Sequence, residues 1–321
     1  MRLLLLLPIL LFSLATKAAN ILIIESYDPS MPWVQDNIRG IKSVLGSKHN
    51  LDYFYLDTKR VPAEQQPAQA QMAWQYYLKG KPDLVIISDD DAINLLAHRI
   101  ARNGTQVVYL GMNGNPRQNG TYGTPHITGV LERPLLKRNI VEMSALIGSP
   151  QKALVLFDDR SVSKTALKEN FGNSSHWQLD KLSVDIAQSN SYSRWQEIIR
   201  TARQHGYEMI FIGLYHTLRD DKGNHIDADD AIRWAGTNSQ VPLFGFWDFS
   251  IGPGKTIGGL VLSGYEHGAA AGSMAEELLA GKQKNVTPRI PSRGEYLFSR
   301  SGTTRWNISI PYDQTSTLWV D

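Results

Sequence analysis

Short apolar runs and amphipathic stretches alternate along most of this chain. Residues 21–24 (Ile-Leu-Ile-Ile) and 84–87 (Leu-Val-Ile-Ile) are continuously apolar, which is typical of β-strands covered on both faces. Residues 32–45 instead place apolar side chains at helical spacing, with polar residues between them. This regular alternation of strand and helix predicts doubly wound sheets made mostly of parallel strands.

The alternation occurs in two successive series, which predicts two lobes. The expected strands are residues 21–24, 51–56, 84–87, 106–110 and 127–131 in the first series, and 153–157, 181–186, 209–214, 242–246 and 259–262 in the second. After them, a helix expected at 268–280 returns the chain to the first series. The predicted fold class is therefore α/β, with two doubly wound lobes of parallel sheets joined by a multi-strand hinge, and a cleft between them.

The first residues predict export. Met1-Arg2 gives a positive start, residues 3–14 are apolar apart from Ser13, and residues 15–18 are mostly small. An apolar run of about 12 residues is too short for a membrane-spanning helix, which needs about 20. Residues 1–18 are thus expected to be a signal peptide cleaved after Ala18, which places the mature protein in the periplasm. An uncleaved N-terminal anchor is the alternative.

Composition narrows the possible partners and chemistry. The chain has no cysteine, which excludes disulfides, thiolate nucleophiles, thiolate zinc sites and a lipid-bearing cysteine after the leader. Loss of residues 1–18 removes Arg2 and Lys17 and no acid, so the 33 basic residues fall to 31 against 31 acidic ones. A mature chain with no net charge gives no reason to expect nucleic acid or a membrane surface as a partner.

The loops after the predicted strands carry the candidate binding residues. Ligands of doubly wound sheets bind beyond the carboxyl ends of the strands. Aromatic side chains there can cover apolar parts of a solute, while carboxylates and amides fix its polar groups. The predicted ligand-binding residues are Ser26, Tyr27, Trp33, Asp89, Asp90, Asn113, Asp158, Tyr215 and Trp247.

Several of these residues have a structural alternative. One of Asp89, Asp90 and Asp91 could instead cap the helix that follows. Asn113 could have a structural role instead, because a Gly-Met-Asn-Gly turn needs a residue that tolerates positive φ. The acids of residues 225–230 are better explained by a solvated helix start with Asp227 as its cap than by a metal site, so we expect no metal and no cofactor.

Several segments resemble a known family when taken in order. They are Ile24-Glu25-Ser26-Tyr27 with Pro32-Trp33, then Ser88-Asp89-Asp90-Asp91-Ala92, Gly111-Met112-Asn113, Ile127-Thr128-Gly129-Val130 and Gly258-Gly259. In this order and spacing the chain resembles bacterial ABC-transporter-type periplasmic substrate-binding proteins with the type I periplasmic-binding fold. The resemblance implies three crossings between the lobes, near residues 129–132, 263–266 and 294–301. It places residues 19–131 and about 265–293 in lobe 1, and residues 132–264 and about 294–321 in lobe 2.

The expected function follows from the cleft and the resemblance. We expect a monomeric periplasmic protein that closes on a small polar ligand and delivers it to an ABC permease. A ligand-sensing subunit for a membrane signalling protein is one alternative. An exported α/β hydrolase or transferase is another, although the strand-end loops show no nucleophile–base constellation, so we expect no enzymatic activity. Amino acids, sugars, nucleosides and small organic acids all remain possible ligands, and the three clustered acids favour one with an amine.

Overall fold

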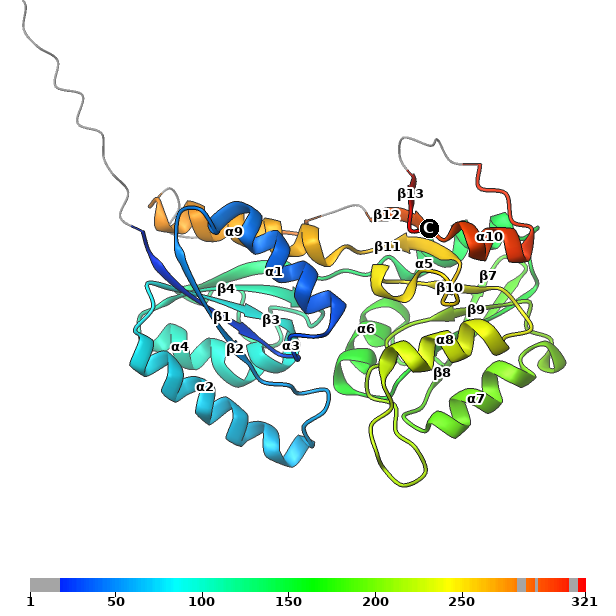
Figure 1. Ribbon diagram of the computed structural model, residues 1–321, viewed down its shortest axis with the longest axis horizontal. Coiled ribbons are helices and arrows are strands. Elements are labelled where there is room, and N and C mark those ends of the chain that lie inside the picture. Colours follow the sequence, from blue (N-terminus) through cyan, green and yellow to red (C-terminus); the bar gives the residue numbers. More distant parts are fainter. Residues whose placement is uncertain (1–17, 282–286, 292–293, 312–316) are drawn as a thin grey trace, which may run out of the picture.

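The first lobe is built on a five-stranded parallel sheet (Figure 1). The computed structural model describes residues 18–281, 287–291, 294–311 and 317–321, and the sheet order in this lobe is β2–β1–β3–β4–β5. These strands are β1 (Asn20–Glu25), β2 (Asn50–Tyr55), β3 (Leu84–Ser88), β4 (Gln106–Met112) and β5 (Ile127–Leu131). All four neighbouring pairs are parallel, as the apolar runs predict.

Helices cover both faces of this sheet. On one face lie α1 (Pro32–Leu45) and α9 (Gly264–Leu279), which pack on alternate side chains of β1. On the other face, after the short turn η1 (Ala63–Gln65), lie α2 (Gln66–Gly80) and the continuous segment α3 (Asp89–Ala92), η2 (Ile93–Ala97) and α4 (His98–Arg102). The helix α9 follows the strands of the second lobe in the chain, so the predicted return to the first series is confirmed.

The second lobe repeats the plan with one departure. Its sheet order is β10–β9–β6–β8–β7, and its strands are β6 (Lys152–Phe157), β7 (His176–Leu179), β8 (Leu182–Gln188), β9 (Met209–Ile212) and β10 (Leu243–Gly245). The edge strand β7 pairs antiparallel with β8, and the sequence pattern did not predict it. Because β7 is only half-buried and polar at alternate positions, it lacks the apolar run that marks the other strands.

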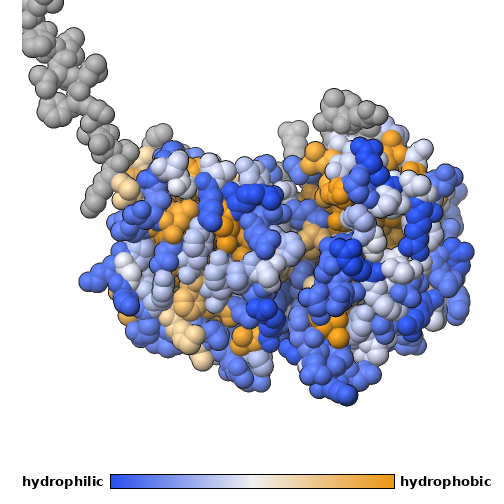
Figure 2. All heavy atoms as spheres, viewed as in Figure 1, coloured by the Kyte–Doolittle hydropathy of each residue, from blue (hydrophilic) through white to orange (hydrophobic). Residues whose placement is uncertain are grey.

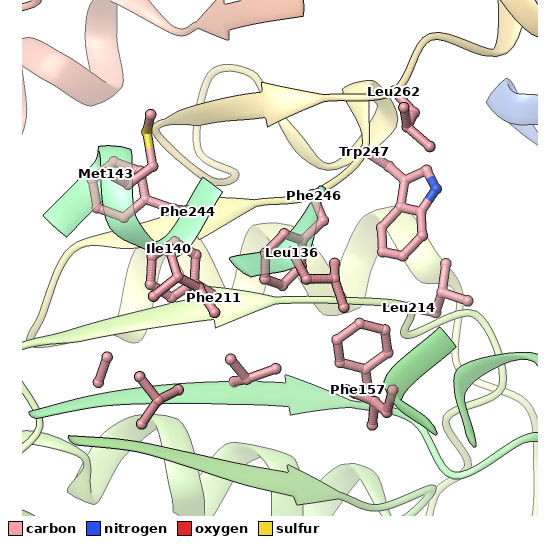
Figure 3. Close-up of a cluster of buried hydrophobic side chains, with 14 of the residues drawn as sticks. Leu136, Ile140, Met143, Phe157, Phe211, Leu214, Phe244, Phe246, Trp247 and Leu262 are labelled. Carbon is pink, nitrogen blue, oxygen red and sulfur yellow. The ribbon is translucent and has the colours of Figure 1, made fainter. Parts of the chain in front are cut away.

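Helices also cover both faces of the second sheet. Its cores contain α5 (Leu136–Leu146) and α6 (Ser161–Phe171) on one face and α7 (Tyr192–Thr201) and α8 (Ala228–Asn238) on the other. The turns η3 (Arg203–His205) and η4 (Asp248–Ser250) follow α7 and β10. Figure 3 shows the first of these cores, in which Phe157, Phe211 and Phe244 lie between the strands and α5.

A third, small sheet lies beside the second lobe. It joins β11 (Gly258–Val261), β12 (Glu295–Phe298) and β13 (Thr317–Trp319), with α10 (Arg300–Trp306) between the last two. The sequence predicts residues 259–262 as a strand of the second series, and β11 lies there beside β10: Ile257 N donates to the Leu243 carbonyl at 2.8 Å, and Trp247 and Leu262 form a parallel bridge. The strand pairs antiparallel with β12, a segment that shows no clear periodicity of its own.

The chain passes between the lobes after β5, after β11 and after α9 (Figure 1). Backbone hydrogen bonds join two of these passages, since Leu131 donates to the Arg289 carbonyl and Arg289 donates to that of Gly129. The lobes also touch directly, because Met31 and Trp33 of the first lobe belong to the same buried apolar cluster as Leu214 of the second. Within the described residues, no helix is long and apolar enough to cross a membrane.

Candidate functional site

Loops from both sheets meet in one small buried chamber. Its volume is about 20 Å³. Most of its wall comes from residues that follow the carboxyl ends of strands β1 to β5 in the first lobe and β9 and β10 in the second. The lining residues are Tyr27, Met31, Trp33, Lys59, Asp89, Asn113, Glu132, Val162, Leu214, Trp247 and Phe249. The topology of both sheets therefore directs the two lobes toward one site.

A larger cavity adjoins the chamber. It has a volume of about 450 Å³, and it shares Met31, Lys59 and Phe249 with the chamber wall. Its other walls include Tyr215 and His216. Figure 2 shows the surface furrowed between the lobes, with hydrophilic residues on both sides. A small solute has room in this outer cavity.

Asp89 is held in an unusual backbone conformation at the chamber wall. It is the first residue of α3 and has a φ of 62°. A Cβ on Gly111 would lie 2.7 Å from the Asp89 Oδ1 atom, so only glycine leaves room for this carboxylate. Trp33 Nε1 donates to Oδ1 at 3.2 Å. Burial first, and then the nearby charge of Glu132, raises the pKa of Asp89 well above its usual range.

Asp90 ties two loops of the first lobe together. Its carboxylate accepts hydrogen bonds from the backbone N–H groups of Asn113 at 2.9 Å and Gly114 at 3.0 Å.

The two structural alternatives for these residues, a helix-capping aspartate and an asparagine with positive φ, are wrong. The N-cap of α3 is Ser88, with no side-chain capping bond. The residue with positive φ in the following loop is Gly111 and not Asn113.

Glu132 links the two lobes at the point where the chain first crosses between them. Its Oε2 atom accepts from Asn113 Nδ2 at 2.9 Å, and its Oε1 atom accepts from Trp247 Nε1 at 2.7 Å. Figure 3 shows Trp247 at the edge of the second lobe's core, with its indole nitrogen on the side away from Phe246. Burial raises the pKa of Glu132 to about 7. One carboxylate thus bridges a first-lobe amide and a second-lobe indole.

The nine predicted site residues are distributed unevenly. Tyr27, Trp33, Asp89, Asn113 and Trp247 line the chamber, and Tyr215 lines the outer cavity. Asp90 faces a separate groove of about 270 Å³ between α3 and α6. Ser26 and Asp158 are buried outside these three cavities. The Ser26 hydroxyl joins β1 to α3, accepting from Ala92 N at 2.8 Å and donating to Ser88 O at 2.6 Å. Asp158 accepts a hydrogen bond from the Ser163 hydroxyl.

The sequence pattern does not single out six residues of the chamber wall, namely Met31, Lys59, Glu132, Val162, Leu214 and Phe249. Lys59, Glu132 and Phe249 lie close behind a predicted strand, so the strand-end rule could have indicated them. From the sequence, Glu132 is expected only as part of the crossing at residues 129–132.

The acids and histidines of residues 216–230 do not form a metal site. Asp227 caps α8, as predicted, by accepting from two backbone N–H groups. His225 Nε2 lies 2.8 Å from the His216 carbonyl. Among the residues that the structure describes, no three His, Asp or Glu side chains are grouped so that they could hold a metal ion.

Comparison with solved structures shows the fold. A Streptococcus pneumoniae ABC domain in complex with L-Trp matches with a TM-score of 0.66 at 15% identity, covering 95% of this chain and 100% of that one. An open, ligand-free substrate-binding protein with adhesive properties from Clostridium difficile matches with a TM-score of 0.65 at 11% identity. The match covers 95% of this chain and 99% of that one. An ABC transporter solute-binding protein from Clostridium phytofermentans with bound L-rhamnose matches with a TM-score of 0.54 at 14% identity, and the match covers 84% of each chain. These likenesses confirm the predicted type I periplasmic-binding fold. No family model matches the sequence, and no curated protein matches it.

Proposed function

We propose that this chain is a periplasmic solute-binding protein that closes on a small polar solute and delivers it to an ABC permease. The observation that carries the proposal is the Glu132 bridge at the wall of a chamber lined by both lobes. A solute in this chamber contacts both lobes only when they are together. It therefore favours the closed state by contacts that the open state lacks.

Direct contacts between the lobes support closure as the working motion. Arg160 of the second lobe donates from Nη2 to the carbonyl of Thr58 in the first lobe at 3.1 Å. The Thr58 hydroxyl in turn donates to Asp91 Oδ2 at 2.7 Å. The Thr58–Asp91 bond lies within the first lobe, whereas the Arg160–Thr58 bond joins the two lobes. The Arg160–Thr58 bond can break and re-form when the lobes separate, without unfolding either lobe.

The solved structures with this fold support a binding role. Two of them are solute-binding proteins with a bound sugar, L-rhamnose or D-arabinose, and a third is an ABC domain in complex with L-Trp. For this chain we therefore propose capture and release of an unmodified small solute. We also propose that it acts as a monomer.

Small-angle scattering with and without a bound solute tests closure. A solute is first found by thermal-shift screening of a metabolite collection, and it should then reduce the radius of gyration. Replacing Trp247 with phenylalanine removes the 2.7 Å hydrogen bond to Glu132, which as a bond to a carboxylate contributes about 1.5–3 kcal/mol. Trp247→Phe should therefore weaken binding about tenfold or more and reduce compaction. Trp74→Phe, on α2 and away from both cavities, is the matched control. An unchanged radius at saturating solute, with an open state demonstrated in its absence, contradicts the clamp.

Two further measurements test compartment and partner. Intact mass of the protein recovered from the periplasm should correspond to a chain that starts at Ala19, and retention of Met1 contradicts export with cleavage. Uptake of the identified radiolabelled solute should fall in cells that lack this chain. Unchanged uptake combined with a lost transcriptional response to the solute indicates a membrane sensor as the partner.

A further inference from the structure

Two buried acceptor atoms at the chamber wall have no donor among the residues that the structure describes. Asp89 is 2% exposed and Asn113 is 3% exposed. Within the described part of the chain, Asp89 Oδ2 and Asn113 Oδ1 have no hydrogen-bond partner. The Asn113 amide nitrogen is already used, because it donates to Glu132. Buried polar atoms are nearly always paired in folded proteins, so these two acceptors point to a ligand that donates hydrogen bonds.

The charge of the chamber favours a cation as that donor. Its wall holds two carboxylates, Asp89 and Glu132, and a single cationic side chain, Lys59. Asp90 adds a third carboxylate close behind, and its charge raises the pKa of both Asp89 and Glu132. A positive group brought into the chamber would offset these like charges in a setting with little water to screen them.

Lys59 shows that a cation is accommodated beside this wall. Its ammonium lies 4.5 Å from the centre of the Tyr27 ring, and the residue is 5% exposed. Its charge lowers the pKa of both Asp89 and Glu132. An aromatic face with nearby carboxylates is a favourable setting for a cation. The rings of Trp33 and Trp247 complete the wall on both sides of the lobe boundary.

Cavity size divides the ligand into two parts. The chamber, at about 20 Å³, takes one small group, and the outer cavity, at about 450 Å³, takes the rest of the solute. The outer wall presents the rings of Tyr215 and Phe249 beside charged side chains such as Arg60, so the larger part meets both apolar and polar surface. We infer that the solute carries a protonated amine that enters the chamber and donates to Asp89 and Asn113, with its body in the outer cavity. This inference rests on the proposed solute-binding function and names its ligand class.

Matched probes that differ only in the amine test the inference on the unaltered protein. The probes are phenethylamine, L-tryptophan and glucosamine, each with its N-acetyl derivative, together with 2-phenylethanol, indole-3-propionate and glucose as uncharged or anionic counterparts. Binding is measured by isothermal titration calorimetry. At least one amine should bind, and N-acetylation should weaken it at least a hundredfold. An N-acetyl derivative or a counterpart that binds as tightly as its amine overturns the inference, and so does the failure of all three amines to bind.

A charge-removing substitution then tests the named residue. Asp89→Asn should weaken amine binding at least tenfold and reduce the preference for the amine over its N-acetyl derivative. The matched control is Asp180→Asn, at an exposed turn. Both positions have positive φ, 62° and 48°, which asparagine tolerates, so neither substitution disturbs the backbone. Unchanged affinity and preference in Asp89→Asn, with an unchanged circular dichroism spectrum, contradicts the role of Asp89.

The two proposals fail in different ways. If an uncharged or anionic solute binds and compacts the protein in scattering, the amine inference is wrong and the solute-binding function stands. If no solute of any charge compacts the protein, the solute-binding function fails as well.

Discussion

Replacing Glu25 with glutamine should stabilise the protein at pH 8 but not at pH 5. Glu25 ends β1 and is fully buried, and its Oε1 atom has no hydrogen-bond partner within the described residues. Burial raises its pKa from 4.5 to about 7. A pKa difference of this size means that the ionised side chain costs the native state about 3 kcal/mol at pH 8.

The glutamine side chain recovers most of this cost. Its carbonyl can still accept the hydrogen bond that the Ser88 hydroxyl gives to Glu25. Its amide nitrogen, however, takes the place of the unpaired Oε1 atom, and an unsatisfied buried donor costs about 1 kcal/mol. The expected net gain at pH 8 is therefore about 2 kcal/mol. The charge of Glu25 also raises the pKa of Asp89, so removing this charge makes ionisation of Asp89 less costly.

The sign of the pH dependence follows from proton binding. Between pH 4.5 and about 7 the native protein holds a proton on Glu25 that the unfolded chain has released. Native stability therefore falls as pH rises through this window and is level above it. Glu25→Gln lacks this contribution, so at pH 5 the variant should equal the wild type or be less stable by about 1 kcal/mol.

Urea unfolding followed by circular dichroism, at intervals from pH 5 to pH 8, measures this difference. Other buried acids, such as Glu132 and Asp248, also make the free energy of unfolding depend on pH, and they do so in both proteins. The difference between variant and wild type removes their contribution. Glu169→Gln, at an exposed position on α6, is the control and should leave stability unchanged at every pH. A difference between Glu25→Gln and wild type that does not vary with pH would refute the reasoning.

Three further predictions concern packing, the site and a helix cap. Gly40→Ala should destabilise the first lobe by about 2–3 kcal/mol, because a Cβ at Gly40 would lie 2.1 Å from the Tyr265 carbonyl oxygen on α9. Gly80→Ala, with nothing within 4 Å, should not destabilise it, and urea unfolding compares the two. If the amine inference holds, Lys59→Met should tighten amine binding severalfold in calorimetry, because a competing cation is removed; weaker binding would mean that Lys59 contacts the solute. Asp227→Ala should cost about 1 kcal/mol in urea unfolding by removing the cap of α8, and no loss would contradict that role.

The amino-acid sequence by itself determined the two-lobed α/β architecture. Apolar runs such as Leu84–Ser88 form strands because a parallel strand is buried on both faces, and this constraint acts on every residue of the run. The strand-end rule then located Tyr27 and Asp89 at one edge of the first sheet and Trp247 at one edge of the second, because all parallel strands of a sheet present their carboxyl ends at the same edge. Periodicity could not locate β7, which is half-buried and made by a local hairpin.

Only the tertiary structure decided which polar groups are partnered and which face the chamber. Ser26 and Asp90 satisfy the same strand-end rule as Asp89, yet Ser26 bonds to α3 and Asp90 to the loop after β4, both within the first lobe. Glu132 gains its bridging position from Asn113 and Trp247, which are 19 and 115 residues away along the chain. Hydrogen bonding and burial of charge depend on neighbours that are distant in sequence. The same residue type at the same kind of loop can therefore hold the fold together or remain available to a ligand.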